Sequence, residues 1–182
     1  IADNVGDNVG DVAGMGADLY ESYVGSIISA SALGVAAFNS IEAMALPMLI
    51  AAVGIILSII GIYAVRTHEN ANIKQLLRSL SVGTMLSSAL IVVASFAVLY
   101  LLGLDRWWQM GCTVVVGLVV GTVIGQATEY YTSQSYKPTR KVSESGQTGA
   151  ATVIISGLGL GMLSTAVPVI AVVVGIIAAY LL

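Results

Sequence analysis

Residues 22–41, with the sequence SYVGSIISASALGVAAFNSI, contain no charged side chain. Four further charge-free runs follow, at 43–65, 79–104, 107–128 and 145–182. A helix needs about 20 apolar residues to cross the hydrocarbon layer of a membrane, and each run reaches that length. The sequence therefore predicts five transmembrane helices, over about 3–40, 43–66, 79–104, 107–128 and 147–182.

The composition excludes a water-soluble domain. Of the 182 residues, 57% are hydrophobic and 9% are charged, and the mean hydropathy is +0.94. Soluble domains carry roughly 25% charged residues, so this chain cannot cover a surface that faces water. A net charge of −3 offers no basic patch for nucleic acid, and the lone Cys112 cannot form an internal disulfide. We expect an all-α, polytopic transmembrane helix bundle, with one bundle domain over 1–182, because barrel strands would alternate polar and apolar residues.

The basic residues predict the orientation of the chain in the membrane. Six of them flank the connections after the second and fourth spans, whereas Arg106 alone lies on the opposite side. By the positive-inside rule those two connections, and with them the N-terminal end, face the cytoplasm. The six are Arg66, Lys74, Arg78, Lys137, Arg140 and Lys141.

The chain is expected to be a piece of a larger bundle. It begins at Ile1 without an initiator Met or a signal peptide, and its first residues already belong to a dense polar motif. The last charge-free run is too long for one straight crossing, and we expect Pro168 to kink it or its first turns to enter water.

Acidic residues are concentrated in the segment DNVGDNVGDVAGMGADLYE, residues 3–21, which holds half of the ten in the chain. On an α-helix, at about 100° per residue, these five side chains project within an arc of roughly 80°. At 1.5 Å per residue the row is about 27 Å long, close to the thickness of the hydrocarbon layer. The five are Asp3, Asp7, Asp11, Asp18 and Glu21.

Aligned carboxylates repel one another, and a buried charge in a membrane is costly, so such a row requires cations. Asp3, Asp7 and Asp11, near the cytoplasmic end, suit Mg²⁺, which prefers carboxylate oxygens and often completes its shell with substrate phosphates. Asp18 and Glu21 lie deeper and are better placed for the passage of an ion, with the Ser22 hydroxyl beside them. The interleaved glycines let other backbones or ligands come close.

The order of these residues resembles a known family. DNVGDNVGD over 3–11, followed by AGMGADLYESY over 13–23, is similar to the signature of membrane-integral, ion-pumping pyrophosphatases. EYYTS over 129–133 and TGAAT over 148–152 resemble the same family in order and separation. The resemblance implies a homodimer with sixteen transmembrane helices per subunit, of which this chain matches helices six to ten.

The resemblance also implies roles for particular residues. Asp3, Asp7 and Asp11 match the aspartates that hold Mg²⁺ and Mg-pyrophosphate, and Asp11 matches the one that helps to orient the attacking water. Asp18 and Glu21 match acids of the ion gate, and Ser22 matches a neighbouring hydroxyl of the sodium-pumping branch. The phosphate-binding lysines of the family lie outside this chain, as does the part that sets K⁺ dependence.

These features predict part of a pump that couples Mg²⁺-dependent pyrophosphate hydrolysis to export of Na⁺ or H⁺, with a prokaryotic plasma membrane as its expected location. Within the family that this chain resembles, a gate glutamate at the position of Glu21, with Gly25 one turn later, is similar to the arrangement in sodium pumps, although some proton pumps share it, and the resemblance therefore implies Na⁺. Two alternatives remain open. An intramembrane prenyltransferase also binds a diphosphate through Mg²⁺ on such a helix, but it has no need of Asp18 and Glu21. A Na⁺ or H⁺ secondary transporter uses buried acids alone, and three aspartates at its mouth would be in excess.

Overall fold

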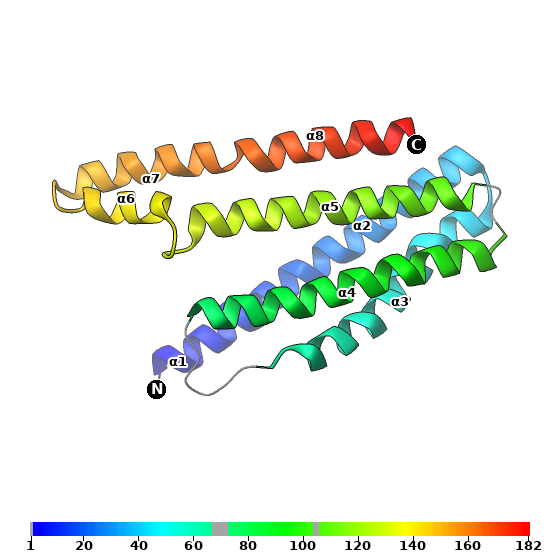
Figure 1. Ribbon diagram of the computed structural model, residues 1–182, viewed down its shortest axis with the longest axis horizontal. Coiled ribbons are helices and arrows are strands. Elements are labelled where there is room, and N and C mark those ends of the chain that lie inside the picture. The colour runs from blue at the N-terminus through cyan, green and yellow to red at the C-terminus, as the bar shows by residue number, and fades with distance from the viewer. Residues whose placement is uncertain (1, 67–72, 104–105) are drawn as a thin grey trace. The chain divides into compact units, whose positions relative to one another are not determined.

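The computed structural model describes residues 2–66, 73–103 and 106–182, and every regular element in these ranges is a helix (Figure 1). Five of the resulting helical segments are long and apolar enough to cross a membrane, which confirms the predicted all-α class and number of spans. The chain divides into two compact units, Ile1–Leu102 and Gly103–Leu182, each of which is described by itself. The single bundle domain over 1–182 stays a prediction.

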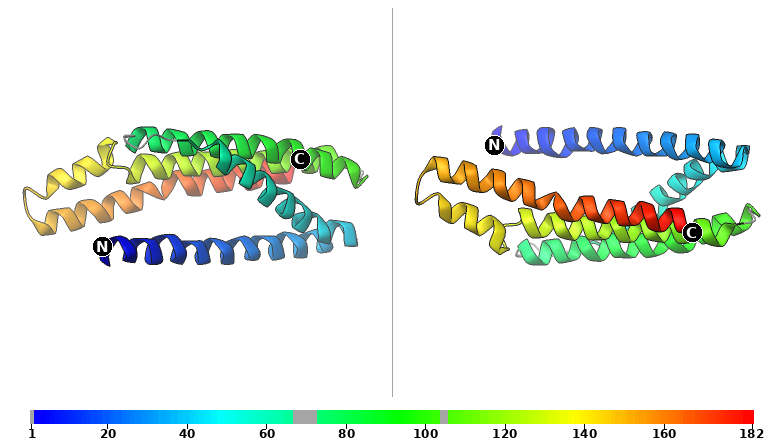
Figure 2. Two further views of the ribbon diagram at one scale, coloured as in Figure 1. Left: turned by 90° about the horizontal axis from the view of Figure 1, so that it is seen from below. Right: turned by 90° about the horizontal axis from the view of Figure 1, so that it is seen from above.

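The first unit begins with a continuous helical rod. It consists of α1 (Ala2–Asp7), the π-helix η1 (Asn8–Gly14) and α2 (Met15–Phe38). Two further helices follow, α3 (Ile41–Ala64) and α4 (Ile73–Leu101). Within the described residues α3 packs against both α2 and α4, whereas α1 and η1 contact only each other and the start of α2. The acidic end of the rod therefore has no covering helix in this unit (Figure 2).

A tight turn reverses the chain between α2 and α3. Asn39 adopts the left-handed conformation, with φ of 48°, and its N–H donates to the carbonyl oxygen of Val35 at 2.8 Å. Asparagine tolerates this conformation better than most residues. The Ser40 hydroxyl then accepts the N–H of Ala43 at 3.2 Å and so caps the first turn of α3. Because the turn is this short, α2 and α3 start their antiparallel packing at close range, and Gly34 lies directly against the backbone of Ala43.

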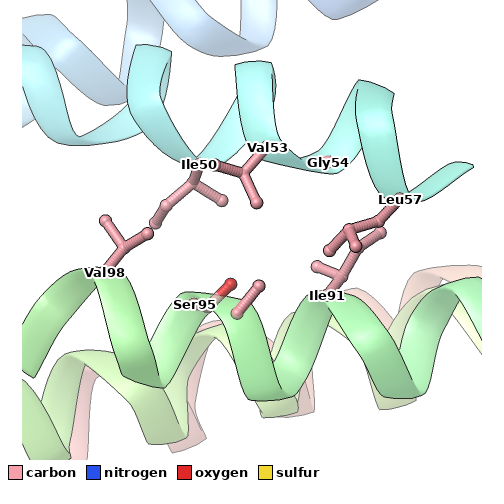
Figure 3. A pocket seen from close by; sticks show the side chains of 8 residues that line it. Ile50, Val53, Gly54, Leu57, Ile91, Ser95 and Val98 are labelled. Atoms are coloured by element: carbon pink, nitrogen blue, oxygen red, sulfur yellow. The ribbon is translucent and has the colours of Figure 1, made fainter.

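Small residues also bring α3 and α4 together. A Cβ on Gly83 would lie 3.2 Å from the carbonyl oxygen of Gly61, and one on Gly61 would overlap the Ser87 side chain. The close approach of backbones at small residues is typical of helix pairs in membranes. Farther along the pair, apolar side chains from the two helices face each other across a narrow gap that does not admit a water molecule (Figure 3). Its lining residues are Ile50, Val53, Gly54, Leu57, Ile91, Ala94, Ser95 and Val98.

The second unit contains two long antiparallel segments and one short amphipathic helix. Its elements are α5 (Trp107–Thr132), α6 (Lys137–Ser145), α7 (Ala150–Ser164) and α8 (Ala166–Leu181). The α8 helix packs along α5, where a Cβ on Gly175 would lie 2.6 Å from Cγ2 of Val120, and α6 packs on α7. Trp107 and Trp108 form an edge-to-face pair, with centroids 5.9 Å apart, at the first turn of α5.

The predicted irregularity in the last span lies close to Pro168. The helix is interrupted at Thr165, between α7 and α8, and both halves continue in nearly the same direction (Figure 2). Proline has no N–H to donate to the carbonyl four residues earlier, which is that of Ser164. The next residue restores the ladder, because the N–H of Val169 donates to Thr165 at 3.1 Å.

Several helices extend beyond the predicted membrane spans, and for one common reason. The α4 helix begins at Ile73 rather than 79, and α5 continues to Thr132 rather than 128. The connection after the fourth span, expected as a loop, contains α6. A charge-free run marks only the part of a helix that lipid can accept, whereas a polar helix can extend into water. The expected end of the third span at 104 falls outside the described residues.

Candidate functional site

The rod formed by α1, η1 and α2 carries all six residues that the sequence selected. Two of the aspartates lie on α1 and one lies in η1, and the two deeper acids and the serine lie on α2. All six side chains are exposed in this unit. The structure thus places on one continuous element the residues that the sequence assigns to substrate and to ion: Asp3, Asp7, Asp11, Asp18, Glu21 and Ser22.

We expected an unbroken α-helix over the acidic segment. This prediction is wrong between Asn8 and Gly14, where the backbone is a π-helix. The residues that flank it, Asp7 (φ −60°, ψ −43°) and Met15 (φ −64°, ψ −32°), are helical, so the rod is not broken. Glycine weakens the preference for regular α-helix, and the segment includes Gly10 and Gly14. π-Helical turns inside α-helices occur frequently at functional sites.

The π-helix changes which carboxylates share a face. A π turn includes about one residue more than an α turn, so the helix beyond Gly14 is rotated back by on the order of 100°. Asp3 and Asp7 keep their common side, whereas on this geometry Glu21 is turned about 100° away from Asp3 and about 140° away from Asp7. The arc of about 80° calculated for an ideal α-helix is therefore too narrow, and the five side chains spread over about 140°. By their position along the rod, we call Asp3, Asp7 and Asp11 the upper group and Asp18 and Glu21 the deeper group.

The upper carboxylates cannot enclose an ion by themselves. Successive members are four residues apart, a rise of about 6 Å along an α-helix. Within the described residues no three acidic, histidine or cysteine side chains come together in a way that could hold a metal ion. A cation bound on this face would therefore have to complete its shell with water, with phosphate oxygens or with groups from other helices, as Mg²⁺ commonly does.

The surroundings of the upper group are polar and open. The Asn8 side-chain amide donates to the backbone carbonyl of Asn4 at 2.8 Å and to its side-chain oxygen at 3.2 Å, which ties the two amides together beside the acids. Apart from the adjoining residues and the backbone of the helix itself, no atom lies within 4 Å of the position that a Cβ would take on Gly6 or Gly10. A phosphate or another backbone can therefore approach this side of the rod closely.

The deeper group lies where the rod begins to pack on α3. The Tyr23 hydroxyl, two residues beyond Glu21, donates to the carbonyl oxygen of Ala51 at 3.0 Å and fixes α2 to α3 at this depth. The Ser26 hydroxyl donates to the carbonyl oxygen of Ser22 at 2.8 Å. Farther along α2, Ser31 is buried, and its hydroxyl has no hydrogen-bond partner among the described residues. The sequence motif included Tyr23 but gave no sign that it would anchor the helix pair.

The two later motifs lie at one end of the second unit. TGAAT begins α7, where the Thr152 hydroxyl donates to the carbonyl oxygens of Ser145 (2.8 Å) and Gly149 (2.6 Å). The Thr148 hydroxyl donates to the same oxygen of Ser145 at 2.8 Å. EYYTS ends α5, and the Thr139 hydroxyl of α6 donates to the Tyr131 carbonyl at 3.1 Å. Both motifs therefore hold α6 in place between the two long helices.

Comparison with known proteins agrees with this arrangement. All of residues 1–182 match the family model described as inorganic H⁺ pyrophosphatase. The chain belongs to this family. It is accordingly an integral, multi-pass membrane segment, with five helices that suit a membrane by length and composition.

Curated relatives in this family carry the names of two kinds of pump. A protein of Bacteroides thetaiotaomicron, named as a K⁺-stimulated pyrophosphate-energized sodium pump, is 70% identical over 100% of this chain. One of the same name from Clostridium tetani is 44% identical over 99% of the chain. A K⁺-insensitive pyrophosphate-energized proton pump of Moorella thermoacetica is 38% identical over 99%. The chain spans about a quarter of the length of these relatives, 26–27%.

Proposed function

We propose that this chain is part of a membrane-bound pyrophosphatase that couples Mg²⁺-dependent hydrolysis of pyrophosphate to the pumping of Na⁺ or H⁺ out of the cytoplasm. The observation that carries the proposal is the single rod with an upper group of aspartates and a deeper Asp–Glu pair. The family match along the whole chain supports it. The remaining helices of the complete protein supply the phosphate-binding lysines and cover the acidic face.

The upper group is proposed to bind the substrate. Asp3, Asp7 and Asp11 are hard oxygen donors on an open face beside glycines, and this donor set fits Mg²⁺. When bound, Mg²⁺ neutralises the charge of pyrophosphate and polarises its phosphoryl oxygens. Asp11 holds the attacking water by a hydrogen bond and accepts its proton, which a carboxylate within hydrogen-bond reach can do.

The deeper group is proposed to handle the transported ion. Asp18 and Glu21 offer carboxylates, and Ser22 adds a hydroxyl oxygen at the level where Tyr23 fixes the rod to α3. Because both groups share one rod, a small shift or rotation of that rod on substrate binding moves the two sites together. The π-helix between Asp7 and Met15 separates Asp3 and Asp7 from the deeper group, so a change in its winding would in addition rotate the deeper group relative to these two aspartates.

We propose Na⁺ as the transported ion, with K⁺ as an activator. The relatives of 70% and 44% identity both carry the name of a K⁺-stimulated sodium pump, whereas a relative named as a proton pump is 38% identical. A homodimer in a prokaryotic plasma membrane completes the proposal. The family match supports neither a prenyltransferase nor a secondary transporter.

The hydrolytic half is tested with Asp11→Asn in the complete protein in membrane vesicles. Loss of the proton-accepting carboxylate should lower Mg²⁺-dependent phosphate release at least about 100-fold, the usual contribution of a general base. Glu42→Gln is the matched control, because Glu42 is an exposed acid at the first turn of α3, at the opposite end of the rod from Asp3, Asp7 and Asp11. Phosphate release that stays near the wild-type rate in Asp11→Asn would refute the assignment.

The transport half is tested with Glu21→Ala. We expect Na⁺ uptake per phosphate released to fall at least tenfold, because the deeper group loses one of its two carboxylates. The measurement is ²²Na⁺ uptake into vesicles alongside phosphate release, with and without K⁺, again with Glu42→Gln as control. An unchanged ratio of Na⁺ uptake to hydrolysis in Glu21→Ala would overturn the ion-gate assignment. If the wild-type protein takes up protons and no Na⁺, the transported ion is H⁺ and not Na⁺.

A further inference from the structure

The second unit contains a cavity that the proposed pyrophosphatase mechanism does not use. Its volume is about 540 Å³, and it opens between the end of α5, the short helix α6 and the middle of α7. This volume is in the range of sites that hold small organic ligands. Its lining residues are Tyr130, Tyr131, Lys137, Pro138, Lys141, Val142, Ser156, Gly159, Leu160 and Leu163.

The charge on the cavity wall is of one sign. Lys137 and Lys141 are one helical turn apart on α6, both are exposed, and both line the cavity. The acids of the neighbouring elements, Glu129 on α5 and Glu144 on α6, are not among its lining residues. Two ammonium groups side by side without a lining carboxylate favour an anion with oxygen acceptors, such as a phosphate group.

Apart from Ser156, the rest of the wall is aromatic and apolar. The rings of Tyr130 and Tyr131 stand edge to face, with centroids 5.1 Å apart, and Tyr136 lies 5.3 Å from Tyr130. Tyrosine is enriched at the boundary between membrane and water. On the α7 side, Leu160 and Leu163 belong to a helix apolar enough to cross the membrane. The cavity therefore has a cationic end on the polar helix and an apolar side on a membrane span.

We propose that this cavity binds an anionic phospholipid of the cytoplasmic leaflet. The lipid phosphate lies between Lys137 and Lys141, and one acyl chain runs along Leu160 and Leu163. Basic pockets between transmembrane helices on the cytoplasmic side are known binding sites for anionic lipid head groups. The predicted orientation puts α6 on that side. A free phosphate would use only the cationic end, whereas a phospholipid matches both parts of the wall.

The head-group half is tested by native mass spectrometry of the complete protein in detergent, titrated with phosphatidylglycerol and with phosphatidylcholine. The wild type should retain phosphatidylglycerol preferentially. Lys137→Gln with Lys141→Gln should weaken its binding about 25-fold, or about fivefold per lysine. The control is Arg66→Gln with Arg78→Gln, which removes two charges on the same predicted side but in the first unit. Equal loss in both double variants, or none in the lysine variant, overturns the proposal.

The acyl-chain half is tested with a matched pair of glycines on α7. Gly159 lines the cavity and Gly157 does not, and a Cβ on either would meet no atom within 4 Å. Gly159→Leu should reduce phosphatidylglycerol binding at least tenfold, and Gly157→Leu should leave it within twofold. Equal binding by both variants refutes an acyl chain at this position. Displacement of the lipid by millimolar inorganic phosphate would show a free-phosphate site instead. Pyrophosphate hydrolysis is measured in parallel for each variant. Because lipid binding and hydrolysis are then known separately, failure of the lipid proposal can be distinguished from failure of the proposed pyrophosphatase function.

Discussion

Replacement of Gly34 by alanine tests how closely α2 and α3 approach. A Cβ at Gly34 would lie 2.7 Å from the carbonyl oxygen of Ala43 and 3.3 Å from its carbonyl carbon. Real Cβ atoms essentially never approach another heavy atom within 3.0 Å, and both neighbours here are backbone atoms that no rotamer change can remove. The two helices must separate locally, although the turn at Asn39 and Ser40 holds them together a few residues away.

The magnitude follows from a matched comparison with Gly54→Ala. Gly54 lies inside α3 beside the narrow gap of Figure 3, and a Cβ there would meet no atom within 4 Å. Both substitutions gain about 1 kcal/mol of helix propensity. Only Gly34→Ala adds an overpacking cost of about 1–3 kcal/mol. The propensity gain cancels in the comparison, so Gly34→Ala should be less stable than Gly54→Ala by about 1–3 kcal/mol.

The measurement is the thermal unfolding midpoint of each variant of the complete protein in one detergent. Gly54→Ala should unfold at or above the wild-type temperature, and Gly34→Ala should unfold below Gly54→Ala. Equal midpoints for the two variants would refute the close approach of α2 to α3 at Ala43. A lower midpoint for Gly54→Ala alone would show that the backbone is crowded at Gly54 and not at Gly34, which would contradict the structure.

Two further changes have expected outcomes. Gly149, at the turn before α7, has a φ of +134° that a Cβ disfavours, so Gly149→Ala should lower stability by about 1–3 kcal/mol, whereas Gly157→Ala in a regular helix should not. Loss of the hydroxyl in Tyr23→Phe removes the hydrogen bond to Ala51 and should cost about 1 kcal/mol. Tyr180→Phe, at a side chain 89% exposed, is its control, and equal unfolding midpoints in either pair would contradict the reasoning.

Most of the fold could be predicted from the sequence, because a membrane constrains each segment of the chain separately. Each apolar run must form a helix to satisfy its backbone in lipid, and no knowledge of the partner helices is needed to see this. The same holds for the acidic row, since its residues and their order are visible in the chain. That Asp3, Asp11 and Glu21 share one rod was predicted correctly, and their roles remain proposals. The helix of basic residues at Lys137–Ser145 was missed, because hydropathy does not distinguish a polar helix from a loop.

The identity of the spans and the presence of five acids on one helical segment were thus determined by the sequence alone, since charge and hydrophobicity are properties of each residue. Tertiary structure decided what depends on the positions of more than one element. The π-helix at Asn8–Gly14 turns Glu21 away from the upper aspartates, which no count of α-helical turns could show. Likewise, Lys137 and Lys141 line one cavity with residues of α5 and α7 only because α6 folds back between those helices. Such features arise from the packing of backbones, which the order of residues does not reveal.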